Sequence, residues 1–209
     1  SVTSLGYCLI KGTGITSITI PKNVTESGYD SWSYPNGALA GCTTLKEVIF
    51  EEGMKRIPSC IMANDDYTSY VEKVVIPESV TSIGTNSFYK CRGLKELDIP
   101  KKVSKVEGGA FAGCTGLETV RFHYNDEIVN TEQDGPKPYS LTLEESIFSG
   151  CTALHTLELT ENVTTIGNYA FDGCSSLTSL TLPESVTSLG YCLIKGTGIT
   201  SITIPKNVT

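Results

Sequence analysis

The feature that most constrains the fold of this chain is a period of about 23 residues. The last apolar residue before each chain-breaking residue marks the period, and these positions are separated by 30, 26, 23, 23, 37, 23 and 22 residues. They are Ile20, Phe50, Ile76, Ile99, Phe122, Leu159, Leu182 and Ile204. A unit of this size cannot bury its own apolar residues, so successive units must stack on one another. The period therefore predicts a solenoid with one continuous apolar interior.

Each unit has three parts. An L-x-x-L-x-L segment, such as Leu177, Leu180 and Leu182, has the alternation of a strand with one buried face. Next comes Val-Thr-Ser-Ile-Gly, as at 80–84, which predicts a second short strand ended by glycine. The last part is Ala-Phe-x-Gly-Cys, as at 110–114, which is too short for a helix and predicts one helical or 3-10 turn.

The repeats predict a single domain over residues 1–209, with about eight units of 22–23 residues. The longer intervals predict insertions near 26–37, 64–70 and 123–145. Long loops on a rigid scaffold often contain functional residues, so these insertions are candidate binding elements.

Residues 1–25 and 185–209 have the same sequence, SVTSLGYCLIKGTGITSITIPKNVT. Exposed positions drift freely, so identity over 25 residues points to recent tandem duplication or to deliberate engineering. Both copies are repeat units without a polar cap, and uncapped units expose apolar surface. Head-to-tail self-association is therefore predicted.

These units resemble the BspA-like leucine-rich-repeat family, whose unit looks like L-x-x-L-x-I-P-x-x-V-x-x-I-G-x-x-A-F-x-G-C. The resemblance covers essentially the whole chain, with departures at Cys8, at Cys192 and over 57–62, where YCLIKGTG and IPSCIM replace the turn motif. It implies a β-rich leucine-rich-repeat solenoid of the α/β horseshoe class. Its parallel sheet would form the concave face, with short second strands and single turns opposite. It also implies a secreted or surface-anchored protein, typically an adhesin or a binder of host matrix.

Charge and motifs argue against several function classes. The formal net charge is −7, and no basic stripe is present to bind a phosphate backbone, so we expect no nucleic-acid partner. No apolar run approaches the roughly 20 residues of a membrane span. His123 and His155 have no nucleophile motif beside them, so we expect neither an enzyme nor a cofactor.

The cysteines and acidic loops allow more than one interpretation. Five of the eight cysteines share one position of the unit: Cys42, Cys91, Cys114, Cys151 and Cys174. A buried ladder of reduced thiols is favoured over disulfides, since each disulfide demands a specific geometry. No closely spaced cysteine pair suggests zinc, and the acidic segments 64–66 and 125–127 lack calcium-loop spacing, so we expect no metal.

Three Asn-Val-Thr sequons, at Asn23, Asn162 and Asn207, are either glycan acceptors or simply the turn that enters the second strand. The turn interpretation is favoured, because the motif recurs at the same point of the unit.

The candidate ligand-binding residues are aromatic side chains of the insertions and an apolar pair on the outward side of two strands. They are Tyr29, Trp32, Tyr34, Tyr67, Tyr70, Tyr124 and Tyr139, with Ile49 and Val75. Such aromatics offer a large contact area to a protein or a glycan. The alternative is that they fold back over the flank of the solenoid. Further along the strands, Asp98, Arg121 and Glu158 alternate in sign and predict pairing between neighbouring units.

Together these features predict an extracellular or cell-surface binding or adhesion module for a protein or glycan ligand. The alternative is a structural spacer, or a head-to-tail fibre element, of a tandem-repeat surface protein.

Overall fold

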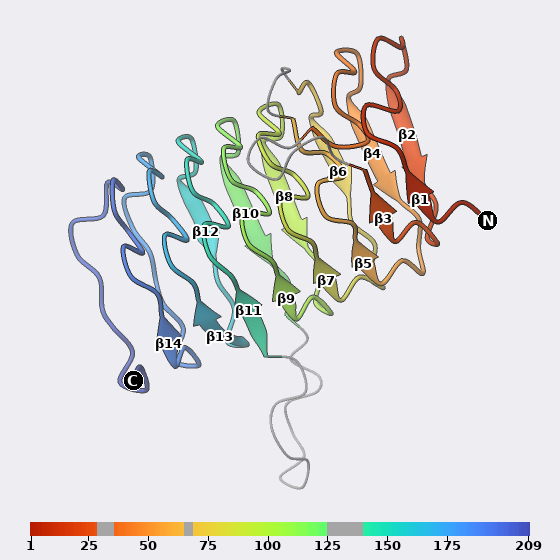
Figure 1. Cartoon of the computed structure of the whole chain (residues 1–209). Helices are drawn as coiled ribbons and strands as arrows, with labels where there is room; N and C mark the ends of the chain where they lie inside the picture. The colour runs from red at the N-terminus through yellow and green to blue at the C-terminus, as the bar shows by residue number, and fades with distance from the viewer. Residues whose placement is uncertain (29–35, 65–68, 125–139) are drawn as a thin grey trace, which may run out of the picture.

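The computed structural model describes residues 1–28, 36–64, 69–124 and 140–209 (Figure 1). None of the described residues is helical. The strands are β1 (Ser4–Leu5), β2 (Ser17–Ile20), β3 (Glu26–Ser27), β4 (Glu47–Phe50), β5 (Arg56–Ile57), β6 (Lys73–Val75), β7 (Ser82–Ile83), β8 (Glu96–Ile99), β9 (Lys105–Val106), β10 (Thr119–Phe122), β11 (Leu141–Leu143), β12 (Thr156–Glu158), β13 (Val163–Ile166) and β14 (Ser188–Leu189).

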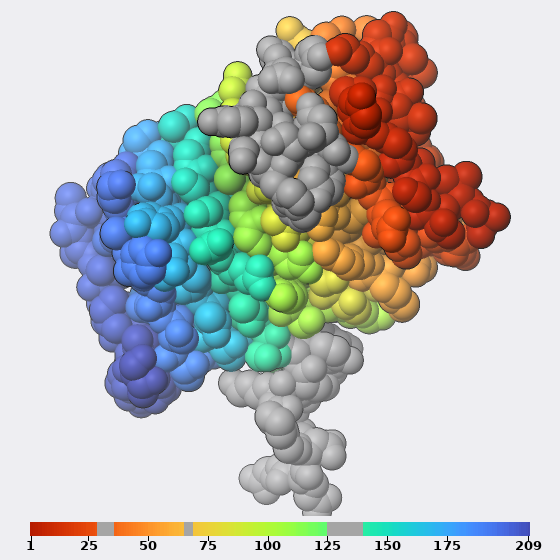
Figure 2. Space-filling model, viewed as in Figure 1, coloured from red at the N-terminus to blue at the C-terminus, as the bar shows by residue number. Residues whose placement is uncertain are grey.

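The strands form two files that run along the solenoid, and all neighbours within a file pair in parallel. The first file contains two three-stranded sheets, β2-β4-β6 and β8-β10-β12. The second file contains the pair β1-β3 and the six-stranded sheet β5-β7-β9-β11-β13-β14. Figure 2 shows the colours following one another in chain order from one end of the molecule to the other, as stacked coils require. The predicted solenoid of parallel strands is confirmed.

One apolar interior runs through the stack. The repeat leucines expected to share it are fully buried in a single cluster: Leu94, Leu117, Leu154 and Leu177. The phenylalanines of the turn motif stack face to face, with centroid distances of 5.1, 5.5 and 6.1 Å along the series Phe88, Phe111, Phe148 and Phe171. Each coil therefore contributes one leucine and one aromatic ring to columns that its neighbours complete.

The turn that follows the second strand has a left-handed backbone position in most coils. Its φ lies between 50° and 57° at Cys8, Cys60, Asn86, Ser146, Tyr169 and Cys192. The turn is closed by i→i+3 hydrogen bonds of the 3-10 type, for example from Cys114 N to Phe111 O at 3.2 Å. Although the motif departs from the consensus at Cys8, Cys60 and Cys192, the backbone keeps the same conformation there.

The cysteine ladder is reduced. All eight cysteines lie in the described part of the chain, and none forms a disulfide. The thiols of Cys114, Cys151 and Cys174 donate hydrogen bonds to carbonyl oxygens of the preceding coil, at 3.1–3.2 Å. Burial raises the pKa of the Cys174 thiol to about 12, so this group stays protonated at neutral pH. The ladder thus satisfies backbone acceptors between coils.

Several local expectations need correction. The insertion boundaries were too wide, because β3 lies within 26–37 and β11 lies within 123–145 as regular second-file strands. The strand motifs at 177–182 and 199–204 do not form assigned strands, although Leu180 and Leu182 are buried. The strand bonds are missing where the stack reaches its C-terminal coils. The inward alternation survives, because it depends only on the apolar interior.

Candidate functional site on the first-strand face

The outward side chains of the first file form a continuous surface, which we call the first-strand face. Its composition changes along the solenoid. From β2 to β12 the outward residues are Ser17, Thr19, Glu47, Ile49, Lys73, Val75, Glu96, Asp98, Thr119, Arg121, Thr156 and Glu158. Only β4 and β6, among these described strands, present an apolar side chain on the outward side.

Ile49 and Val75 are neighbours on this face. They are register partners in the parallel pair β4-β6, with Thr19 opposite Ile49 on the other side. Both apolar side chains are half-buried. The pair predicted from the sequence is therefore a contiguous apolar surface on two adjacent coils.

Charged residues surround this apolar pair. Lys73 Nζ lies 2.7 Å from Glu47 Oε1, and this contact lowers the pKa of the Glu47 carboxyl. Lys46 forms a second ion pair with Glu72 and lies over an aromatic ring, 5.5 Å from its centroid. That ring belongs to Tyr70, which is 43% exposed. We call Ile49, Val75, Tyr70 and the four charged residues Lys46, Glu47, Glu72 and Lys73 the β4–β6 patch.

The next three strands carry charge pairs without an apolar centre. Arg121 Nη1 lies 2.9 Å from Glu96 Oε2, and this hydrogen bond raises the pKa of the guanidinium. The prediction that Asp98, Arg121 and Glu158 pair with one another is therefore wrong for the ion pair itself. The register does place both acidic residues opposite Arg121. The diagonal glutamate forms the contact instead, and Asp98 contacts the ring of His123 at 3.0 Å.

The C-terminal coils continue the face with hydroxyl groups. Ser179, Thr181, Ser201 and Thr203 line a shallow hollow of about 420 Å³ between the last two coils. Glu184 also lines this hollow. The face thus changes from hydroxyl groups at β2 to a mixed apolar and charged patch, then to charge pairs, and finally back to hydroxyl groups.

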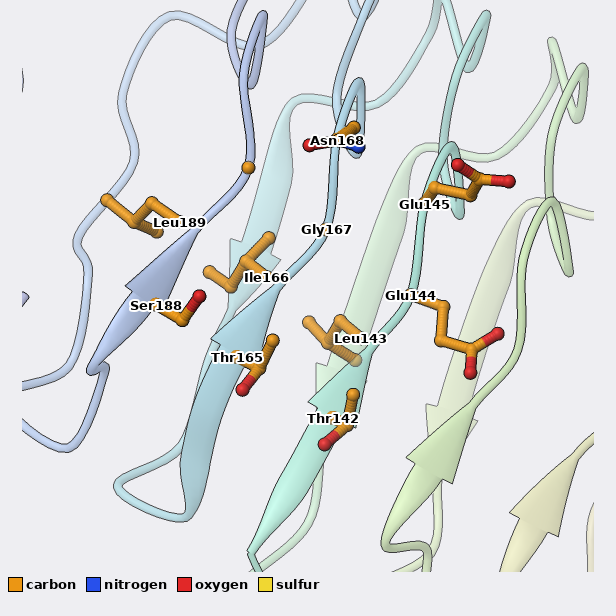
Figure 3. A pocket seen from close by; sticks show the side chains of 11 residues that line it. Thr142, Leu143, Glu144, Glu145, Thr165, Ile166, Gly167, Asn168, Ser188 and Leu189 are labelled. Carbon is orange, nitrogen blue, oxygen red and sulfur yellow. The ribbon is translucent and has the colours of Figure 1, made fainter. Parts of the chain in front are cut away.

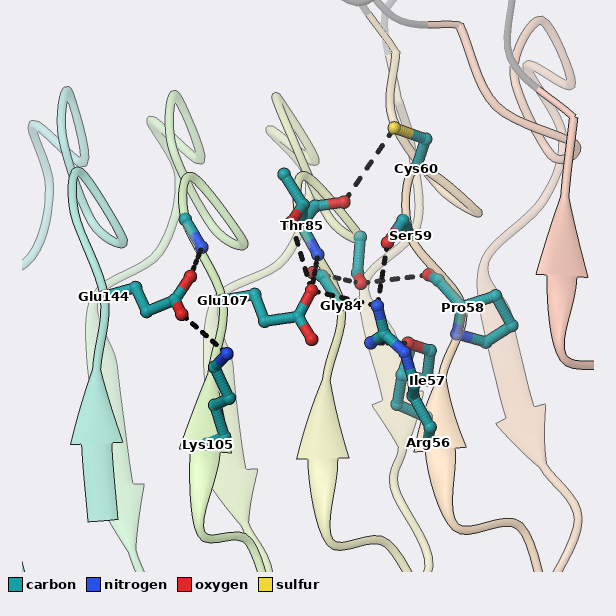
Figure 4. Close-up of polar contacts among 12 residues, drawn as sticks. Arg56, Ile57, Pro58, Ser59, Cys60, Gly84, Thr85, Lys105, Glu107 and Glu144 are labelled. Carbon is teal, nitrogen blue, oxygen red and sulfur yellow. Dashed lines mark hydrogen bonds and ion pairs between the residues drawn. The ribbon is translucent and has the colours of Figure 1, made fainter.

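The second-strand face is organised differently, because its carboxylates bind neighbouring coils. Glu107 Oε2 accepts from Arg56 Nη2 at 2.9 Å and from the Thr85 amide at 3.1 Å (Figure 4). Glu144 repeats this arrangement one coil later, with Lys105 Nζ at 2.8 Å and the Gly108 amide at 3.0 Å. Each carboxylate therefore joins its coil to the preceding coil through a cation and a backbone N–H.

Beside this network lies an open hollow of about 460 Å³ (Figure 3). Thr142, Thr165 and Ser188 line it as register neighbours on β11, β13 and β14. Gly167 also lines it, and a Cβ at that position would lie 2.5 Å from the Glu144 carbonyl carbon. Close stacking of the coils therefore requires glycine here, which accounts for the glycine of the repeat motif.

The predicted aromatic residues are only partly placed by the structure. Tyr29, Trp32, Tyr34, Tyr67 and Tyr139 lie outside the described residues. Tyr70 precedes β6 and half-buried Tyr124 follows β10, so these two lie beyond opposite ends of the parallel strands. The structure joins Tyr70 to the apolar pair through Lys46 and leaves Tyr124 apart from them.

Sequence reasoning missed the charged residues of the β4–β6 patch. The signal was present, because Lys46 and Glu72 alternate in sign at one position of successive units, as Lys95 and Glu118 do further along. Position-by-position comparison of the units would have found both pairs.

Two searches of the described part of the chain gave negative results. No group of three or more potential metal ligands converges there. The described segments also contain no helix long and apolar enough to cross a membrane.

Comparison with known proteins identifies the family. The model of the BspA type leucine rich repeat region matches in six copies, over residues 3–133 and 139–209. The chain belongs to this family. Leucine-rich repeats bind proteins in general and are usually non-catalytic, and the match indicates no enzyme family. No curated protein matches the chain.

Solved structures show the same fold for this BspA-type chain. A leucine-rich repeat protein from Bacteroides ovatus is 28% identical, with a TM-score of 0.68. The match covers all of this chain and 48% of that protein, so the chain spans about half the length of this relative. The leucine rich repeat protein of T. pallidum is 22% identical with a TM-score of 0.57, covering 84% of this chain and 72% of its own.

Proposed function

We propose that this BspA-type chain is a cell-surface or secreted binding module and that its first-strand face contacts a protein or glycan ligand. The observation that supports this most strongly is the β4–β6 patch. An apolar pair with an exposed tyrosine beside it, ringed by charges, has the composition of a small interface centre with a polar rim. The family supports both the binding role and the location at the cell surface.

The ion pairs of the patch suit it to recognition. Side chains of Lys73 and Glu72 are 67% and 61% exposed, so a ligand can reach both charges. Exposed pairs contribute little to stability, which leaves these residues available for electrostatic selection of a partner. Aromatic residues of the insertions, including Trp32, extend the proposed contact area.

Binding to immobilised collagen, laminin and a glycan array tests the proposal. We expect Val75→Asp and Tyr70→Ala each to weaken binding, since truncation of a central interface residue costs about 2 kcal/mol or more. Thr181→Asp is the matched control, because it adds the same charge to the same face four coils away from Val75. Equal binding of Val75→Asp and wild type to every bound probe would contradict a site at the patch.

Trp32→Ala separates the insertion from the strand face. If this variant binds as wild type while Val75→Asp does not, the site is confined to the face. Loss with Trp32→Ala alone would move the proposed site to the insertion.

A structural spacer is the second candidate function. The observation that favours it is the identity of residues 1–25 and 185–209, which offers a unit for a tandem array. Electron microscopy of the array would show a rod whose length grows in proportion to the number of 184-residue units, without any requirement for ligand.

A further inference from the structure

The two identical segments lie at opposite ends of the molecule (Figure 1), and each is covered on one side only. In the N-terminal copy, Val2 is 56% exposed and Ile20 is 1% exposed. In the C-terminal copy the matching residues behave in the opposite way, since Val186 is fully buried and Ile204 is 52% exposed. One copy is therefore covered by the coil after it, and the other by the coil before it.

The coil that covers the C-terminal copy is residues 162–184. It holds the copy through the parallel register pairs of β13 and β14, where Thr165 lies opposite Ser188 and Ile166 opposite Leu189. The turns add backbone bonds, such as Phe171 N to Leu193 O at 3.1 Å. Residues 1–25 have every side chain and backbone group that these contacts use, because their sequence is the same.

We propose that a second copy of this chain is a partner, and that residues 1–25 of one molecule replace residues 185–209 on the coil 162–184 of another. We call this coil exchange. The incoming coil is then covered on both sides: Val2 takes the buried position of Val186, and Ile20 stays buried against its own next coil. The solenoid continues from one molecule into the next, and the first-strand face stays accessible.

Coil exchange keeps the number of coil-to-coil interfaces constant. One interface between 162–184 and its covering coil is lost in one molecule, and an identical interface forms between two molecules. The free energy of contact is thus nearly balanced, and the population of exchanged chains depends on concentration. Any change that loosens residues 185–209 shifts the balance toward exchange.

The same substitution in the two copies gives opposite expected results. Val186→Asp places a carboxylate in a buried position and loosens the chain's own C-terminal copy, so in sedimentation velocity we expect the apparent dissociation constant for self-association to fall by about tenfold or more. Val2→Asp leaves an exposed position in the monomer but buries the charge in the exchanged form, so self-association should be lost. Equal association of the two full-length variants would overturn the proposal.

A disulfide test covers the case in which Val186→Asp disturbs folding. Ser4 matches Ser188, so exchange places Ser4 of one molecule opposite Thr165 of another. In a Cys8→Ser, Cys192→Ser background, Ser4→Cys with Thr165→Cys should give disulfide-linked dimers and longer chains on non-reducing gels. Thr165→Cys with Ser188→Cys is the control and should close within one molecule. Monomers only, from the first pair at high protein concentration, would refute coil exchange.

Discussion

The two copies of the 25-residue segment have one sequence and two structures. Ser17–Ile20 forms β2 and pairs with β4, whereas the same four residues at 201–204 form no assigned strand. Ile20 is buried by the coil that follows, and Ile204 has no following coil in this chain. In this solenoid, burial and strand formation at a given residue are therefore determined by the neighbouring coil as well as by the local sequence.

The largest expected effect contrasts an interior coil with a terminal copy. Phe111 stacks between Phe88 and Phe148, so Phe111→Ala should lower the free energy of unfolding by about 3–5 kcal/mol. Ile194 has the matching position in the C-terminal copy and is only partly buried, so Ile194→Ala should cost less. Urea denaturation measures both changes. Equal losses would show that coverage on two sides confers no extra stability.

A second comparison uses the same residue type in the two copies. Ile20→Ala removes a fully covered side chain and should cost about 2–4 kcal/mol, whereas Ile204→Ala should stay within about 0.5 kcal/mol. The same denaturation experiment applies. A reversed order would mean that the C-terminal copy is the better-covered one.

Cysteines give a smaller contrast. Cys114→Ala removes a buried thiol and its hydrogen bond to Phe88 O, so we expect a loss of about 1–2 kcal/mol. Cys192→Ala changes an exposed side chain and should alter stability by less than about 0.5 kcal/mol. Thermal unfolding under reducing conditions separates the two. A large effect at Cys192 alone would contradict a structural role for the ladder.

The smallest effect distinguishes the charged middle of the first-strand face from its hydroxyl ends. Lys73 and Lys95 lower the pKa of Glu47 and Glu118 respectively below the ordinary 4.5. A lowered folded-state pKa adds stability that is complete above the unfolded pKa and disappears as pH falls through the folded pKa. The Tm of Glu47→Gln with Glu118→Gln should therefore fall less than that of wild type on acidification below about pH 4.5. The difference should shrink with added salt, since both pairs are exposed. Parallel Tm curves would contradict these pairs.

Sequence reasoning recovered the features that every coil shares. The period, the inward leucines such as Leu117 and the cysteine ladder depend only on the local alternation and the stacking of units. The apolar pair Ile49 and Val75 was also recognised, because outward positions follow directly from the strand pattern.

Features that depend on which coil lies next could not be predicted in the same way. The ion pair of Arg121 with Glu96 rather than with Asp98 is a choice between side-chain geometries of neighbouring coils. Burial of the sequon residue Asn162, unlike exposed Asn23 and Asn207, reflects the side of the coil that its neighbours cover. Identical motifs thus acquire different environments.

Thiol accessibility at matched positions tests the central claim most directly. In the Cys8→Ser, Cys192→Ser background, cysteine is introduced singly at Val2, Val186, Ile20 and Ile204, and maleimide labelling of the native protein is followed by mass. We expect rapid labelling at positions 2 and 204 and strong protection at positions 186 and 20. Matching rates at equivalent positions of the two copies would contradict the account.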